Sequence, residues 1–144
     1  MTATASTSRR LRVDHERVDR FRITVRQHTL WVDQPVLDGG EDGAATPTEL
    51  FVASLASCVA FYVRRFLARH GLPVAGLSVI ADYDMAAQPA RVGEVRLQVQ
   101  LAGDLPPERR AALLAVAARC TVHNTVQHGL PVRIALAAAV SDRA

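Results

Sequence analysis

The sequence predicts a single α+β domain over residues 1–144, and three observations support this. Polar and apolar residues alternate over 20–26, 77–85 and 95–101, which is the two-residue period of half-buried strands. An almost unbroken apolar segment over 50–63 is flanked by helix start and stop signals. No repeat, low-complexity tract or linker divides the sequence, so these strands and helices belong to one domain.

The first part of the chain predicts a tail, a small sheet and a loop. Residues 1–10 form the expected flexible tail, and 11–13 add a short strand. The strand over 20–26 turns back into a second strand over 29–32, which gives a hairpin. The segment 33–46 holds one proline and three glycines without periodicity, so we expect a loop there.

The start of a long helix is marked by a capping-box sequence. Thr46 supplies the N-cap hydroxyl, Pro47 suits the first helical position, and Glu49 is the matching acid. The helix should end at about His70, because Gly71 and the proline that follows stop it.

The first half of this helix has almost no polar stripe, so we expect it to be buried on all sides. Its large apolar residues are Leu50, Phe51, Val52, Leu55, Val59, Phe61 and Val63. A small chain surrounds a helix most readily by dimerising, which predicts a homodimer. The apolar segment of 14 residues is too short to cross a bilayer and no export signal precedes it, so we predict a soluble cytoplasmic protein that binds no membrane.

The second half of the chain predicts another hairpin, two helices and a closing strand. The hairpin joins the strands over 77–85 and 95–101, and a helix follows over 104–119. Thr121 is the expected cap of a third helix that ends at His128. The residues 132–140 are expected to form the last strand.

The charge pattern argues against nucleic acid as a partner. All 17 basic residues are arginine, and the formal net charge is only +3. Residues 1–26 contain seven arginines against three acids, which would suit phosphate binding. Phe21 is the only aromatic residue there, whereas single-strand binders interleave several, so a solvated charged strand is the simpler interpretation.

Two cysteines are far apart in the sequence and form no C-x-x-C motif. Cys58 lies within the long helix, where an inert buried thiol is the simpler interpretation. Cys120 precedes Thr121 at the start of the third helix, where free backbone amides stabilise a thiolate. Two interpretations therefore remain open, inert core thiols or a reactive thiol couple.

A reactive thiolate needs a permanent cation nearby, and the strand over 20–26 offers Arg20, Arg22 and Arg26. Glu49 could orient such an arginine, although its capping role explains this acid equally well. Glu49 and Cys58 are separated by about 900° of rotation and roughly 13 Å of rise on an ideal helix, so they point to opposite sides. A unit of Arg, Glu and Cys would then take one member from the other subunit.

Other chemistries find little support in the sequence. Cys120, His123 and His128 are spaced as C-x2-H-x4-H, which matches structural zinc sites poorly, so no metal is expected. The sequence contains no glycine-rich phosphate loop, G-x-S-x-G elbow or H-E-x-x-H motif. Nucleotide-binding, hydrolase and metalloprotease functions are therefore not indicated.

Two segments resemble the cysteine motifs of the OsmC and Ohr family of thiol-dependent peroxidases. The first, ending at Cys58, is Thr-Pro-Thr-Glu-Leu-Phe-Val-Ala-Ser-Leu-Ala-Ser-Cys, and the second, around Cys120, is Ala-Arg-Cys-Thr-Val-His-Asn-Thr-Val. The resemblance extends from about Phe21 to Val140. It implies an interlocked homodimer in which long central helices pack between antiparallel sheets.

The resemblance also implies an activity, the reduction of organic hydroperoxides and, more weakly, hydrogen peroxide in oxidative stress defence. Cys58 would form a sulfenic acid that Cys120 resolves as a disulfide. Glu49 matches the family's active-site acid, and Arg22 lies nearest the position of its arginine, with Arg20 and Arg26 as alternatives. No cofactor is implied beyond an external lipoyl-type or thioredoxin-type dithiol as reductant.

A second interpretation is a non-enzymatic homodimer that binds a small apolar ligand or senses redox state through its thiols. Turnover separates the two, because a sensor is oxidised once whereas a peroxidase is recycled by its dithiol. The joint presence of Cys58, Cys120, Glu49 and a nearby arginine favours the enzyme.

Overall fold

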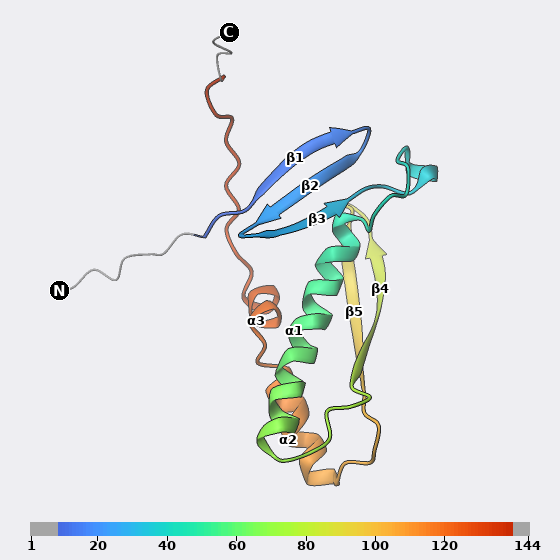
Figure 1. The fold of residues 1–144 in the computed structure, drawn as a ribbon, viewed down its shortest axis with the longest axis vertical. Coiled ribbons are helices and arrows are strands. Elements are labelled where there is room, and N and C mark those ends of the chain that lie inside the picture. The colour runs from blue at the N-terminus through green and yellow to red at the C-terminus, as the bar shows by residue number, and fades with distance from the viewer. Residues whose placement is uncertain (1–8, 140–144) are drawn as a thin grey trace, which may run out of the picture. The chain divides into compact units, whose positions relative to one another are not determined.

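A computed structural model describes residues 9–139 (Figure 1). The predicted N-terminal tail lies mostly outside the described residues. The described chain divides into two compact units, one made of 9–57 and 79–99 and the other of 58–78 and 100–139. Both strands and helices are present, as the α+β prediction requires.

The first unit contains a three-stranded antiparallel sheet in the order β1-β2-β3. Its strands are β1 (Arg12–Arg17), β2 (Arg20–Val25) and β3 (His28–Val32). Ile23 on the central strand lies opposite Val13 on β1 and Leu30 on β3. The predicted hairpin is confirmed, and β1 is longer than expected because its polar residues also pair with β2.

The same unit contains most of a two-stranded sheet, β4 (Ser78–Ala86) with β5 (Arg91–Gln100). This confirms the second predicted hairpin. β5 begins four residues before the predicted position, and its charged residues are held by ion pairs. The Arg96 guanidinium contacts Asp84 at 2.7 Å and Glu94 at 2.9 Å.

The loop between β3 and the long helix is organised by a buried carboxylate. Asp33, only 1% exposed, accepts hydrogen bonds from the backbone amides of Gln34 at 2.7 Å and Gly43 at 2.9 Å. These two amides hold the pKa of Asp33 below its usual range. A side chain at Gly40 would collide with the Gln34 carbonyl, because its Cβ would lie 2.1 Å from that oxygen. The loop is otherwise irregular, as predicted, apart from the short 3-10 turn η1 (Val36–Asp38).

The long helix α1 (Pro47–Arg69) begins at the predicted capping box. The Glu49 amide donates to the Thr46 hydroxyl at 3.1 Å, and the Thr46 amide donates to the Glu49 carboxylate at 2.8 Å. Two amides that have no partner inside the helix are therefore satisfied by side chains.

Burial of α1 differs from the prediction, because one chain covers only one face of the helix. Val52, Val59 and Val63 are buried, whereas Phe51 is 45% exposed and Phe61 is 50% exposed. The expectation that the apolar segment is too short to cross a bilayer also needs correction. By length and composition alone, α1 is long and apolar enough to span a membrane. Core helices of soluble proteins meet the same criterion.

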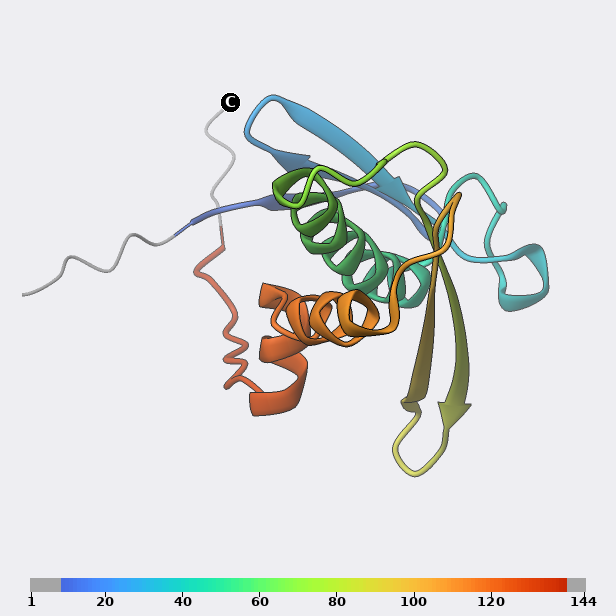
Figure 2. The same ribbon diagram turned by 90° about the horizontal axis from the view of Figure 1, so that it is seen from below.

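The second unit packs α2 (Pro107–Ala117) and α3 (Thr121–His128) beside the C-terminal half of α1 (Figure 2). Its core consists of apolar side chains of which one is aromatic, and they are Val59, Val63, Phe66, Leu67, Leu105, Leu113, Ala117 and Cys120. The predicted cap of α3 is wrong by one residue. Cys120 is the N-cap, and Thr121 is the first residue of the helix.

The predicted closing strand is not present over 132–139, and residue 140 lies outside the described part of the chain. This segment is extended but has no assigned secondary structure, although its apolar residues still alternate. Ile134 is 94% exposed and Leu136 is 99% exposed. The alternation shows strand propensity, but a strand also needs a neighbour to share its backbone hydrogen bonds.

Candidate functional site

The structure brings Cys58 and Cys120 together within the second unit, although 62 positions separate them in the sequence. Both are free cysteines. Cys58 projects from the middle of α1, and Cys120 occupies the bend between α2 and α3. Burial is the main cause that raises the pKa of Cys120, and a side-chain hydrogen bond with Cys58 raises it further, so the two side chains are neighbours.

The environment of Cys120 keeps it protonated. Its side chain is completely buried, and this burial is the main reason that the pKa of Cys120 is raised above its ordinary value. The backbone amide of His123 donates to the Cys120 sulfur at 3.3 Å, which acts in the opposite direction but is outweighed. The expectation that the helix N-terminus stabilises a Cys120 thiolate is therefore only partly correct: the amide contact exists, and burial overcomes it.

The environment of Cys58 is different, because its side chain is only half-buried. A small molecule in solvent therefore reaches Cys58 before it reaches Cys120. The two cysteines therefore form an asymmetric pair. The Cys58 thiol is accessible from solvent, and the neighbouring Cys120 thiol is buried and protonated.

A hydrogen bond that the sequence analysis missed ties the two cysteine segments together. The hydroxyls of Tyr62 and Thr121 lie 3.3 Å apart. Tyr62 follows Cys58 by one helical turn, and Thr121 directly follows Cys120. The four-residue spacing from Cys58 to Tyr62 was the available signal for a residue on the same helix face.

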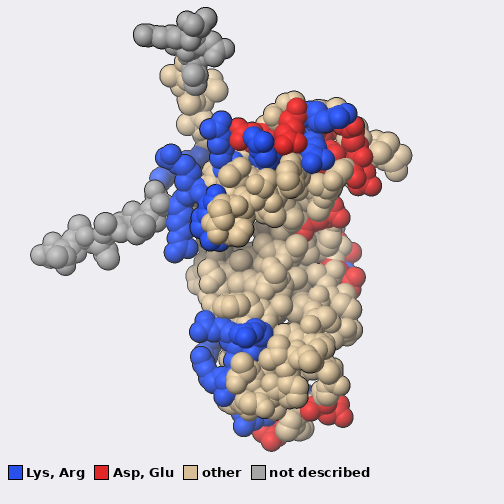
Figure 3. All heavy atoms as spheres, viewed as in Figure 1, with Lys and Arg blue, Asp and Glu red and all other residues tan. Residues whose placement is uncertain are grey.

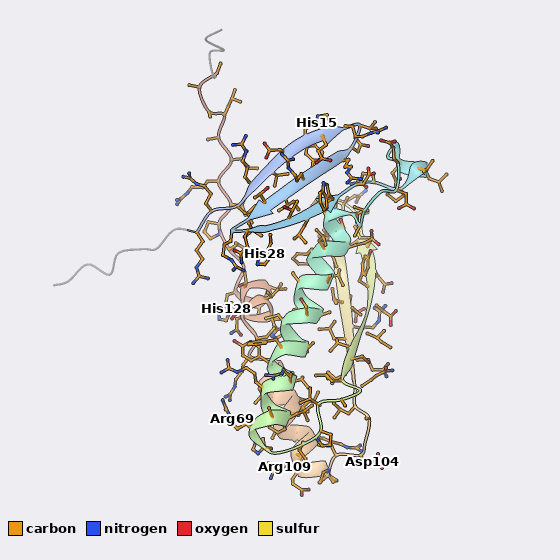
Figure 4. The ribbon with its side chains drawn as sticks, in the orientation of Figure 1. His15, His28, Arg69, Asp104, Arg109 and His128 are labelled. Atoms are coloured by element: carbon orange, nitrogen blue, oxygen red, sulfur yellow. The ribbon has the colours of Figure 1, made fainter. Side chains whose placement is uncertain are left out.

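A cavity of about 260 Å³ opens beside Tyr62 in the second unit. Its lining comes from α1 and from the end of α2, and consists of Tyr62, Arg65, Phe66, Arg69, Val116 and Arg119. Figure 4 shows Arg69 beside the last turns of α1. Three arginines and two aromatic rings make the cavity both cationic and apolar. The sequence analysis assigned no role to these arginines.

Glu49 lies in the first unit and acts as the capping acid of α1. The interpretation of Glu49 as a helix-capping residue is therefore confirmed. The hydrogen bond to the Thr46 amide uses one carboxylate oxygen, so the second oxygen remains for another partner.

The three candidate arginines also lie in the first unit but differ in their surroundings. Arg20 contacts Glu16 at 3.1 Å and lies 5.4 Å from the centre of the Trp31 ring. Arg22 is 3.9 Å from Glu16, a looser contact, and is exposed. Arg26 lies in the turn after β2 with a positive φ of 52°. Arg22 is thus the least constrained cation on the strand itself.

The histidines near Cys120 have structural contacts. His123 donates from Nδ1 to the Ala118 carbonyl at 2.8 Å, and His128 donates from Nδ1 to the Asn124 carbonyl at 2.9 Å. Over residues 9–139, no group of three His, Cys, Asp or Glu side chains is arranged to hold a metal ion.

Comparison with known proteins identifies relatives of this chain. The family model described as OsmC-like protein matches residues 39–135, which contain both cysteines and Glu49. No curated protein gives a significant sequence match.

Several solved structures share the fold. A candidate osmotic-stress-induced and detoxification response protein from Psychrobacter arcticus 273-4 is 24% identical with a TM-score of 0.77, and the match covers 85% of this chain and 91% of that chain. An organic hydroperoxide resistance protein OsmC from Legionella pneumophila is 24% identical with a TM-score of 0.65, covering 86% and 92% of the two chains.

A third similar structure, from Vibrio cholerae O1 biovar eltor str. N16961, is that of a candidate organic hydroperoxide resistance protein with captopril bound in one of its active sites. It is 19% identical with a TM-score of 0.64, and the match covers 88% of this chain and 90% of that chain.

Proposed function

The chain belongs to the OsmC-like protein family, and from this premise we propose that it protects against peroxides as a thiol-dependent peroxidase. The proposal rests mainly on the asymmetric pair of Cys58 and Cys120. One sulfur is reachable from solvent, and its neighbour is buried and protonated. Two of the similar structures are described as organic hydroperoxide resistance proteins, which supports organic hydroperoxides as substrates.

The first step is an attack by the Cys58 thiolate on the terminal oxygen of the hydroperoxide. The O–O bond breaks, Cys58 becomes a sulfenic acid, and the alkoxide takes up a proton and leaves as an alcohol. The sulfur loses two electrons and the peroxide gains them. Cys58 takes this role because its side chain is accessible, whereas Cys120 is completely buried.

The second step is resolution by Cys120. Its sulfur attacks Cys58, the S–O bond breaks, and the hydroxyl leaves with the Cys120 proton as water. The product is a Cys58–Cys120 disulfide. An external dithiol of the lipoyl or thioredoxin type then donates two electrons, regenerates both thiols and is itself oxidised to a disulfide.

Glu49 and one of the strand arginines are the proposed supporting residues. Arg22 is our first choice, because of the two candidates on strand β2 itself it has the looser contact with Glu16, at 3.9 Å against 3.1 Å for Arg20. A guanidinium close to a thiolate stabilises its negative charge and cannot lose its own proton. Glu49 would orient the guanidinium with the carboxylate oxygen that the capping bond leaves available.

The working form that we propose is a homodimer in the cytoplasm. A single chain leaves large apolar side chains exposed on α1 and on the C-terminal segment, including Phe61, Ile134 and Leu136. A second copy would cover this surface and give the C-terminal segment a strand to pair with. A reducing cytoplasm would supply the dithiol that turnover needs.

The test is consumption of cumene hydroperoxide and of hydrogen peroxide by the wild type, Cys58→Ser and Cys120→Ser, with a dithiol or a monothiol as reductant. We expect dithiol-dependent turnover that is faster with cumene hydroperoxide and is lost in both variants. A Cys58 sulfenic acid should accumulate in Cys120→Ser and be trapped by a dimedone-type reagent.

The same kinetic measurements can refute the proposed peroxidase activity. Absence of turnover by the wild type with any dithiol, while both thiols remain titratable, would refute the peroxidase. The non-enzymatic sensor or ligand-binding dimer would then be the better account of the pair.

A further inference from the structure

The cavity in the second unit is lined by neither cysteine, but Tyr62 in its wall lies one helical turn beyond Cys58 and Arg119 directly precedes Cys120. We propose that Arg65, Arg69 and Arg119 bind an anionic group at the far end of an apolar hydroperoxide, so that the enzyme prefers peroxides that carry a carboxylate. This inference rests on the proposed peroxidase function and names the class of substrate.

The unit that holds both cysteines is rich in arginine. Residues 58–78 contain three arginines and no acid, and together with 100–144 they hold eight arginines against three acids, a net charge of +5. The remainder of the chain has a net charge of −2. Figure 3 shows basic side chains gathered over α2 and the last turns of α1. The unit that holds both cysteines therefore has a net positive charge, whereas the remainder of the chain has a net negative charge.

The arginines of the cavity are not neutralised by acidic side chains of the described residues. Within residues 9–139, no acidic side chain lies within 4.0 Å of the guanidinium groups of Arg65, Arg69 or Arg119. Arg65 instead lies over the ring of Phe61, at 5.4 Å from its centre. Three guanidinium groups around one cavity repel one another unless an anion is bound between them. A carboxylate accepts the paired hydrogen bonds that guanidinium donates.

Two of the arginines lie on the same face of α1 as Cys58. At 100° per residue, Arg65 and Arg69 lie within about 20° of Cys58 on the surface of α1. They are about 10 Å and about 16 Å from Cys58 along the helix axis. Consider a substrate whose peroxide group lies at Cys58 and whose carboxylate is joined to it by an extended chain of about 10 to 16 Å. Its carboxylate would then lie at Arg65 and Arg69.

Apolar and aromatic side chains accompany the arginines in the lining of the cavity. Tyr62 and Phe66 follow Cys58 by one and two turns and contribute their rings to the cavity wall. Val116 adds an apolar surface from α2, and Arg119 directly precedes Cys120. The cavity thus offers apolar contact for a hydrocarbon chain and cations for its end.

The experiment compares linoleic acid hydroperoxide with its methyl ester, which has the same peroxide and chain but no charge. We expect the wild type to show a lower KM for the acid. Arg69→Gln should raise that KM about threefold, and the double variant Arg65→Gln with Arg69→Gln about tenfold, because exposed ion pairs each contribute modestly. The KM for the ester should stay within about twofold, and the preference for the acid should shrink at high salt.

Arg64→Gln is the matched control. Arg64 is exposed on the same helix beside Arg65 but does not line the cavity. Its removal changes the net charge by the same amount as the Arg69 substitution and should leave the preference for the acid unchanged.

A binding measurement keeps this test separate from turnover. Decanoate should bind the wild type and Cys58→Ser alike by calorimetry, should bind Arg69→Gln more weakly, and should bind better than decanol. Decanoate binding without any peroxidase turnover would refute the proposed function and leave the anion site standing. Turnover with equal KM for acid and ester, and no preference for decanoate over decanol, would overturn the anion site alone.

A comparison of two reductants shows whether the anion that the arginines bind belongs to the peroxide or to the reductant. Dihydrolipoate carries a carboxylate and dihydrolipoamide does not, so they are compared as reductants at a fixed concentration of the ester. We expect the arginine substitutions to change neither rate. A loss restricted to dihydrolipoate would assign the arginines to the reductant and overturn their proposed role in peroxide selection.

Discussion

At the scale of single residues, the two thiols owe their different properties to their surroundings. Cys58 is half-buried on a helix, whereas Cys120 caps a helix and is completely buried. Both cysteines could be identified from the sequence, which also predicted that free backbone amides lie near Cys120. It did not predict that burial would outweigh those amides, because burial depends on how α1 and α2 pack.

Glu49 has a structural role that a single substitution can separate from a chemical one. Glu49→Gln retains an oxygen that accepts from the Thr46 amide, so we expect unfolding free energy within about 0.5 kcal/mol of the wild type. If the charge of Glu49 orients an arginine at the thiolate, kcat/KM should fall at least about tenfold. Urea unfolding and peroxide kinetics on the same preparation check both effects. Unchanged kinetics would restrict Glu49 to capping.

The raised pKa of Cys120 predicts a pH dependence of stability. The folded state holds the Cys120 proton more tightly than the unfolded state, so its contribution to stability is complete below the ordinary cysteine pKa. It is lost as pH rises through the higher folded value. We expect the unfolding free energy of the reduced wild type to fall above about pH 8.5, the ordinary cysteine pKa, more steeply than that of Cys120→Ala. Parallel curves for the two proteins would contradict this.

At the scale of elements, the sequence predicts the helices and the hairpins, whose two strands are neighbours in the chain, but not the fate of the C-terminal segment. The capping box fixed the start of α1, and the alternation of polar and apolar residues located β2, β4 and β5. The same alternation over 132–140 did not produce a strand over 132–139 in one chain. A helix satisfies its own hydrogen bonds, whereas a strand depends on a neighbour.

The capping box supplies a prediction for α1. Thr46→Ala removes the hydroxyl that accepts from the Glu49 amide, so we expect a loss of about 1 kcal/mol in unfolding free energy. Thr46→Ser retains the hydroxyl and should remain close to the wild type. Denaturant titrations of the three proteins make the comparison, and an equal loss in both variants would show that the methyl group and not the cap matters.

Asp33 supplies a prediction for the loop that precedes α1. Amides of Gly43 and Gln34 favour its ionised form and lower its pKa, so its contribution to stability is present above the ordinary aspartate pKa and is lost as pH falls through the lower folded value. Asp33→Asn should therefore be less stable than the wild type at neutral pH and lose less stability on acidification. Urea titrations from neutral to acid pH test this, and an equal acid dependence in both proteins would contradict it.

At the scale of the whole molecule, exposed apolar surface is the property that one chain leaves unexplained. The predicted burial of α1 on all sides fails for a single chain, since Phe51 and Phe61 are exposed. The C-terminal segment exposes alternating apolar residues as well. The second copy of the chain that we propose would cover both surfaces.

The proposed dimer predicts a response to charge placed on the C-terminal segment. The wild type should sediment with the mass of two chains. The double variant Ile134→Asp with Leu136→Asp should dissociate to one chain at micromolar concentration, because burying two carboxylates in an apolar interface is unfavourable. Leu37→Asp is the matched control, since Leu37 is 99% exposed like Leu136 but lies in the separate turn η1. Sedimentation velocity decides the outcome: a wild-type monomer would refute the dimer, and a variant that remains dimeric would show that the C-terminal segment lies outside the interface.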